Sequence, residues 1–269
     1  MLLALAFVAV TQTKIGPPPS ESNLNTFYKK HVALNGFPII SSEKVPDKAI
    51  LVALEIVKKM TQQRPEILKE MARQHVKLAV MAFSEQTLDI PEHSDLQKAF
   101  PKTDWNKRAR GLGATTERPV VSCAEENVLC YGNDRYKGES ILIHEFSHAM
   151  RNMGIAFCDK ELDKEIDLAF KSAMEKGLWQ KTYASTNSDE YWAEGVQDWF
   201  DCNATATPAN GVHNEIHTRV QLKQYDPGLA KAIEKAFGDS DWRWSESWVH
   251  TQIESIKQAS ETKLERRYN

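Results

Sequence analysis

His144-Glu145-Phe146-Ser147-His148 is the stretch of this sequence that most constrains its fold. The two histidines are four residues apart, so on a helix both side chains lie on one face and reach a common point. Glu145 lies about 100° around the helix from His144. The pentapeptide therefore predicts a helix that presents two imidazoles and a carboxylate at one site.

Apolar residues surround this pentapeptide and predict that its helix is mostly buried. The helix is expected over about 139–153, and its apolar positions are Ile141, Leu142, Ile143, Phe146, Ala149, Met150 and Met153. Gly138 precedes the helix and Gly154 follows it, where glycine favours a helix end. Polar side chains on a buried helix are costly unless a partner satisfies them. A metal ion satisfies all three, and the alternative is a hydrogen-bonded pair of core histidines with an exposed Glu145.

The spacing is the H-E-x-x-H pattern of zinc peptidases. We therefore expect His144 and His148 to bind one catalytic Zn²⁺ ion, and Glu145 to hold a water molecule beside it. A catalytic zinc site takes a third protein ligand. The metzincin continuation H-x-x-G-x-x-H does not supply this ligand, because Arg151 stands where that pattern has Gly and Gly154 where it has His.

A second, acidic helix is the best source of the third ligand. Over residues 188–202, Glu190, Glu194 and Asp198 recur every four residues and form one stripe, and most other positions are apolar. We assign Glu190 to the metal, and Glu194 to a hydrogen bond with the second nitrogen of a ligand imidazole. Two alternatives remain. The two glutamates exchange these roles, or Asn187 and Glu190 form a capping box and the stripe faces water.

Two other patterns point less clearly to chemistry. His213 and His217 are four residues apart, but no glutamate follows the first histidine. We expect a surface pair, and the alternative is an accessory metal site or a substrate contact. Gly111-Leu112-Gly113 lacks the third glycine, the preceding strand and the following helix of a phosphate loop. We expect a surface loop there.

The rest of the chain predicts a helix-rich α+β fold with one folded domain over 23–269. This domain divides into a helical N-terminal part over about 23–75, a catalytic core over about 76–204 and C-terminal helices over about 205–269. Apolar periodicity predicts helices at 24–35, 46–60, after Pro65, and at 159–176, 226–237 and 245–266. Short apolar runs predict strands at 76–83, 120–122 and 128–131, and residues 89–116 are expected to be a loop.

The N-terminus predicts export. Residues 1–10 form an apolar run too short to span a bilayer. We expect a signal peptide over 1–13, although no Lys or Arg precedes the run, and a truncated start or a buried strand is the alternative. A Pro-rich linker is expected over 14–22. The net charge of −3 and the pI near 6.3 provide no basic surface for nucleic acid.

Four cysteines also favour a secreted protein, because an even set in an exported chain predicts disulfides. Cys123 and Cys130 suit a bridge across a strand-turn-strand unit, and Cys158 and Cys202 suit a second bridge. Four cysteines allow three connectivities, and the sequence does not choose among them. Asn203-Ala204-Thr205 is a glycosylation sequon, which is usable only in a chain secreted by a eukaryote.

The acidic helix, together with the residues before it, resembles a known group of enzymes. Residues 183–194 read Y-A-S-T-N-S-D-E-Y-W-A-E. With the H-E-x-x-H helix, this segment is similar to gluzincins of the lethal-factor type, including Pro-Pro endopeptidases. The resemblance covers about 138–202. It implies a zincin-like fold with a small sheet packed on the histidine helix. It also implies that Glu190 is the third zinc ligand, Glu194 the carboxylate behind the ligands and Tyr183 the tyrosine that assists the oxyanion.

We therefore expect a secreted zinc endopeptidase that acts on a protein or peptide substrate. Glu145 would take a proton from water and pass it to the leaving amine, and Tyr183 would donate a hydrogen bond to the oxyanion. A strand within 120–131 is the candidate for edge pairing with the substrate. The alternatives are a gluzincin-fold binding or toxin-like module without turnover, and a zinc hydrolase of a non-peptide bond.

Overall fold

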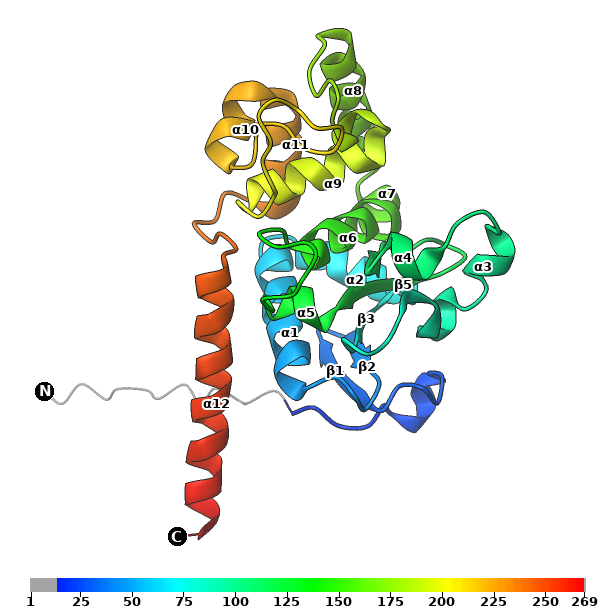
Figure 1. The fold of residues 1–269 in the computed structure, drawn as a ribbon, viewed down its shortest axis with the longest axis vertical. Coiled ribbons are helices and arrows are strands. Elements are labelled where there is room, and N and C mark those ends of the chain that lie inside the picture. Colours follow the sequence, from blue (N-terminus) through cyan, green and yellow to red (C-terminus); the bar gives the residue numbers. More distant parts are fainter. Residues whose placement is uncertain (1–13, 269) are drawn as a thin grey trace, which may run out of the picture.

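A five-stranded mixed sheet forms the base on which the helices of this protein are assembled (Figure 1). The protein is described from a computed structural model, which places residues 14–268 and describes side chains for residues 14–261. The strand order is β1-β2-β3-β5-β4, with bounds β1 Lys30–Leu34, β2 Phe37–Ser41, β3 Lys77–Met81, β4 Gly111–Leu112 and β5 Val120–Ala124. The three central strands run parallel, and the two edge strands run antiparallel to their neighbours. The predicted helix-rich α+β class is confirmed.

The first two strands form a hairpin where the sequence predicted a helix at 24–35. Leu34 pairs with Phe37 across a two-residue turn. Asn35 and Gly36 both have positive φ, of 51° and 86°, which a tight hairpin turn of this kind requires. The helix prediction was wrong because the Asn-Gly turn signal outweighs the local apolar spacing. The N-terminal part of the domain is therefore not wholly helical.

Residues preceding this hairpin also belong to the sheet. Gly16 and His31 form an antiparallel bridge, so part of the expected linker at 14–22 is attached to the outer strand. The expected signal peptide at 1–13 lies outside the described residues. Within residues 14–268, no helix combines the length and the apolar character that crossing a bilayer would need.

Most of the long helices lie close to where apolar periodicity predicted them. Their bounds are α1 Asp47–Thr61, α2 Pro65–Arg73, α6 Ile141–Ala149, α8 Lys160–Glu175, α9 Ser188–Trp199, α11 Pro227–Phe237 and α12 Glu246–Tyr268. The sequence did not predict α10 Arg219–Tyr225. The expected loop at 89–116 contains short elements, which are η3 Pro91–His93, α3 Leu96–Ala99, α4 Trp105–Arg108 and the edge strand β4.

The two faces of the sheet are buried by different parts of the chain. Leu78 and Val80 of β3 belong to the main core, which also contains buried residues of α1, α2, α6 and α9. Ala79 and Met81 point to the opposite face, where Tyr28 and Ile90 belong to a smaller core. The main core therefore supports α6 from below, and α9, α10 and α11 lie above α6 (Figure 1).

The histidine helix is longer than the sequence predicted. It runs through α6 into a π-helical segment, η4 Met150–Ile155, and then into α7 Ala156–Cys158. Gly154 therefore lies inside the helix rather than at its end. A Cβ at position 154 would lie 2.6 Å from Ile67 Cγ2, so glycine is needed for the close packing of η4 on α2. Ser140 caps the N-terminus of α6 and accepts a hydrogen bond from Ile143 N.

All four cysteines are free thiols, so the prediction of two disulfides was wrong. Residues 125–128 form a short helix, α5, instead of the strand expected at 128–131, and no strand-turn-strand unit places Cys130 opposite Cys123. Cys202 is fully buried, whereas Cys158 is exposed at the end of α7. The cysteines consequently provide no support for export.

A buried histidine next to the sheet makes the stability of the fold pH-dependent. His93 in η3 is 1% exposed, and its Nε2 lies 3.0 Å from Ser122 Oγ on β5. Burial lowers the pKa of His93 from 6.5 to about 4. Because the folded pKa lies below the unfolded one, its contribution to stability is present above pH 6.5 and is lost as the pH falls toward 4.

We expect the free energy of unfolding to fall by roughly 2 kcal/mol between pH 7.5 and pH 5 on account of His93. The measurement is urea unfolding of wild type and His93→Gln at both pH values. The variant should be less sensitive to acid by about that amount. Equal sensitivity in the two proteins would show that His93 is not buried in its neutral form.

Candidate metal centre

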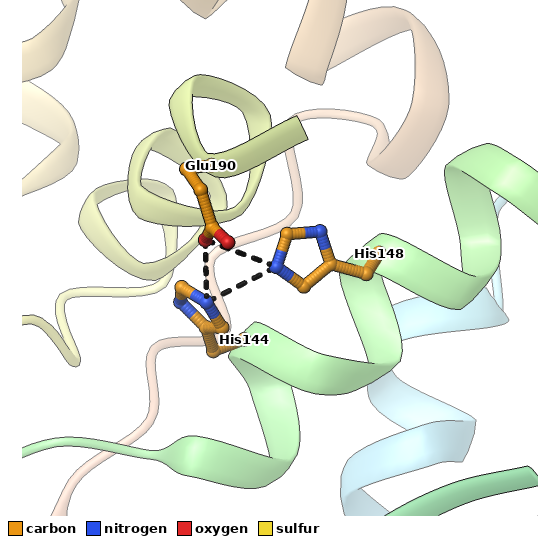
Figure 2. A group of neighbouring side chains, drawn as sticks. All are labelled: His144, His148 and Glu190. Carbon is orange, nitrogen blue, oxygen red and sulfur yellow. Dashed lines mark hydrogen bonds and ion pairs between the residues drawn. The ribbon is translucent and has the colours of Figure 1, made fainter. Parts of the chain in front are cut away.

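Two buried helices, α6 and α9, cross so that their polar side chains meet (Figure 2). Asn187 caps α9, and its Oδ1 accepts hydrogen bonds of 2.9 Å from the backbone nitrogens of Asp189 and Glu190. Every residue from Tyr191 to Trp199 is buried. Trp192 Nε1 donates to Ser147 O of α6 over 2.9 Å. The acidic stripe of α9 therefore faces α6 rather than water. The alternative, in which Asn187 and Glu190 form a capping box and the stripe is exposed, is not observed.

His144, His148 and Glu190 form a triangle of three possible ligand atoms (Figure 2). Glu190 Oε2 lies 3.2 Å from His144 Nε2 and 3.2 Å from His148 Nε2. The two imidazole nitrogens are also 3.2 Å apart. A tetrahedral zinc ion with ligands at about 2.0–2.1 Å separates its ligand atoms by roughly 3.3 Å. The three atoms therefore fit one tetrahedral ion, and the open fourth position is typical of catalytic sites.

The pKa values of His144 and Glu190 show that a positive charge at the centre of the triangle is favourable. Burial lowers the pKa of His144, but the hydrogen bond to Glu190 and three nearby carboxylates outweigh burial and raise it to about 10. Burial raises the pKa of Glu190, but the two imidazoles outweigh it and hold this pKa well below its usual range. In the protein alone, a proton supplies the positive charge. A divalent cation would supply it with better geometry, because it contacts all three atoms at once.

Glu145 is not part of the triangle but lies beside it. Its side chain is half-buried and lies close to β4. A Cβ on Gly111 of β4 would lie only 3.1 Å from Glu145 Cγ. Burial raises the pKa of this carboxyl group. A carboxylate with a raised pKa accepts a proton from water more readily than one at its ordinary value.

Gln197, not Glu194, makes the hydrogen bond to the second nitrogen of a ligand imidazole. His144 Nδ1 lies 2.7 Å from Gln197 Oε1 but 3.7 Å from Glu194 Oε1. The role predicted for Glu194 is therefore corrected. Gln197 is seven residues after Glu190, two helical turns along the same face, and this spacing was the signal that could have found it. The exchange of roles between Glu190 and Glu194 is also not observed, because only Glu190 approaches both Nε2 atoms.

Behind the imidazoles, Glu194 and Asp198 are buried and share one donor. Asn203 Nδ2 lies 3.1 Å from Glu194 Oε2 and 2.9 Å from Asp198 Oδ1. Burial raises the pKa of both carboxyl groups, because no cation offsets the loss of solvent completely. Asn203 is 8% exposed, and its amide nitrogen points into the protein. The sequon at 203–205 is therefore not an accessible glycan site in this fold.

The structure separates the second histidine pair. His213 lines the same cavity as the triangle, and its Nε2 lies 3.6 Å from Glu139 Oε1. His217 instead has Nδ1 3.1 Å from Glu215 O, on the 214–218 loop. The two imidazoles do not share a site, and the expectation of a surface pair is wrong for His213.

A cavity of about 530 Å³ opens over the triangle. It is bounded by α6, α9, β4 and the loops that carry Tyr183 and His213, and its lining includes Arg108, Gly111, Leu112, Gly113, Tyr136, Glu139, His144, Glu145, His148, Tyr183, Glu190 and His213. Sequence reasoning missed Arg108, whose Nη2 lies 3.4 Å from Tyr183 Oη. Arg108 and Tyr183 are 75 residues apart, so only the tertiary fold brings them together.

The strand beside this cavity is β4 and not the segment 120–131 that the sequence suggested. β5 pairs with β3 on one side, and β4 covers Ser122 and Cys123 on the other, so β5 is not the edge strand of the sheet. β4 is the edge strand and lines the cavity. A Cβ on Gly113 would lie 2.8 Å from His148 Cβ, so glycine at 113 allows the chain to run directly against the ligand helix.

Comparison with known proteins identifies a similar fold. No protein-family model matches the chain, and no curated protein matches it. A Pro-Pro endopeptidase from Paenibacillus alvei has a similar structure, with a TM-score of 0.50 and 16% sequence identity. The match covers 74% of this chain and 97% of that one. This protein therefore has a fold like that of a Pro-Pro endopeptidase. At this level of identity the likeness concerns the fold.

Removal of Glu190 or Gln197 should weaken zinc binding to different extents. Glu190→Ala removes a ligand atom, so we expect the purified protein to lose stoichiometric zinc. Gln197→Leu removes only the hydrogen bond to His144, so we expect zinc affinity to fall roughly 10–100-fold. Competition with a chromophoric chelator measures both.

Gln62→Leu is the matched control, since Gln62 is exposed at the end of α1. Its zinc affinity should equal that of wild type. If Gln197→Leu binds zinc like wild type while Glu194→Gln binds it weakly, then Glu194 and not Gln197 orients His144.

Proposed function

We propose that this protein is a zinc-dependent endopeptidase of the gluzincin type. The observation that carries the proposal is the triangle of His144, His148 and Glu190, with 3.2 Å sides that fit a tetrahedral zinc ion. Glu145 beside the triangle gives the site a proton acceptor that metal binding alone does not require. The fold shared with a Pro-Pro endopeptidase supports the same class of reaction.

The chain supplies proton transfer to this reaction. When bound, zinc polarises the scissile carbonyl and makes water more acidic. Glu145 takes a proton from that water onto its carboxylate and later gives it to the nitrogen of the leaving amine. Its side chain lies against Gly111 of β4 and lines the same cavity as the triangle.

Tyr183 is proposed to stabilise the oxyanion. Its side chain lines the same cavity as the metal ligands, and the short helix η5 Tyr183–Ser185 leads directly into the cap of α9. Tyr183 N donates to Val212 O over 2.8 Å, which ties the tyrosine to the loop that carries His213. A hydrogen-bond donor held in place before the reaction contributes about 3 kcal/mol or more to such a step.

An extended peptide is the substrate that this cavity suits best. β4 is a short sheet edge beside Glu145, and edge strands bind extended peptides through backbone hydrogen bonds. This edge favours a peptide over a non-peptide substrate. The presence of Glu145 favours turnover over a silent binding module. Export of the protein stays a proposal that rests on the apolar run at the N-terminus.

Cleavage of an unbiased peptide library by the zinc-loaded protein tests this proposal. We expect wild type to cleave internal peptide bonds, as read by mass spectrometry. Glu145→Gln should keep one zinc per chain and lose activity by roughly 100-fold to 10,000-fold, because the proton acceptor is gone. Glu161→Gln on the exposed face of α8 is the control and should cleave like wild type. A wild-type protein that holds one zinc but cleaves no peptide would contradict the proposal.

A further inference from the structure

Arg108 is the only lysine or arginine among the described residues that line the cavity. Five carboxylates line the same cavity, and two of them, Glu190 and Glu145, act on the charge of Arg108; the five are Glu139, Glu145, Asp189, Glu190 and Glu194. An oxyanion that forms in such surroundings is repelled by each of them that is ionised. Outside the imidazoles, the charge of Arg108 is therefore the one in this cavity lining that opposes the repulsion.

The donor and acceptor roles in the contact between Arg108 and Tyr183 are fixed by their chemistry. Arginine has only donors, so at the 3.4 Å contact Nη2 donates and Tyr183 Oη accepts. The hydroxyl hydrogen of Tyr183 is then left for its other partner, the carboxylate of Glu190, and the carbonyl oxygen of a bound peptide would take over that hydrogen bond. A positive donor on the phenolic oxygen also polarises the O–H bond and makes it a stronger donor to that carbonyl oxygen.

The backbone on both sides of this contact is held in place. Arg108 is the last residue of α4, and the next carbonyl, that of Ala109, accepts a hydrogen bond of 2.5 Å from Thr87 Oγ1. Arg110 Nε is paired with Glu126 Oε1 at 2.7 Å. On the other side, Tyr183 is anchored through its own backbone nitrogen. The side chain of Arg108 is exposed, but it projects from a fixed position toward Tyr183.

We propose that Arg108 is a positioning residue for Tyr183. It holds the phenolic oxygen so that the O–H group points toward the carbonyl oxygen of the bound peptide, and it strengthens that hydrogen bond as negative charge develops there. The proposal deepens the peptidase function given above and rests on it. The contact involves no bond formation, and Arg108 need not touch the substrate.

A double-mutant cycle tests whether Arg108 acts through Tyr183. We expect Arg108→Met to lower kcat roughly 10-fold, with KM within about twofold of wild type, because the lost contact matters only as charge develops. In the Tyr183→Phe background, Arg108→Met should have no further effect. Arg108→Lys should recover part of the rate. Lys107→Met removes the neighbouring exposed charge and should leave kcat unchanged.

Zinc content and circular dichroism of each variant provide a readout that is independent of turnover. Both should match wild type, which would show that the loss of rate does not come from a loss of folding or of metal binding. If Arg108→Met lowers the rate equally in the wild-type and Tyr183→Phe backgrounds, or changes KM instead of kcat, the proposal is overturned and Arg108 contacts the substrate directly. If wild type cleaves peptides and Arg108→Met cleaves them at the same rate, the proposal for Arg108 is also overturned, while the peptidase function stands. A wild type that cleaves nothing overturns the function itself.

Discussion

The crossing of α6 and α9 is the constraint on which the rest of this structure depends. Each helix is mostly buried but carries polar side chains, and a buried carboxylate or imidazole is costly without a partner. The crossing turns these side chains toward each other, so Glu190 meets His144 and His148. The indole of Trp192 fixes the register by donating to the backbone of α6. The same contact between two helices therefore pairs the buried polar groups and sets the spacing of the three possible ligand atoms.

The remaining parts of the site are supplied by segments that reach this crossing from elsewhere. The sheet supports α6 from below, and β4 brings a backbone edge against Glu145. The segment after α8 brings Tyr183, and α4 brings Arg108 into contact with it. The helices thus provide the three possible metal ligands, whereas shorter segments shape the space in which a substrate would lie. Differences in substrate preference among proteins with this fold would accordingly reside in these segments.

The sequence allowed the ligand triangle to be predicted because each of the two helices carries a recognisable local spacing of polar residues. His144 and His148 share a helix face, and Glu190 followed from an acidic stripe on a second apolar helix. Gln197 lay on that same stripe but was overlooked because a carboxylate is the stronger acceptor for an imidazole N–H. Arg108 and the edge strand β4 could not be predicted, since their roles arise from contacts between distant segments. The Asn35-Gly36 turn could have been predicted from its two residues, but it lies at the end of a run whose apolar spacing favours a helix.

The most direct test of this account is anomalous diffraction at the zinc edge from crystals of the zinc-loaded protein. The account predicts one peak at about 2.0–2.1 Å from His144 Nε2, His148 Nε2 and a carboxylate oxygen of Glu190, with Glu145 beside it but not bound to it. A peak coordinated by Glu194 or by a cysteine, or the absence of any peak between α6 and α9 in protein that contains zinc, would contradict it.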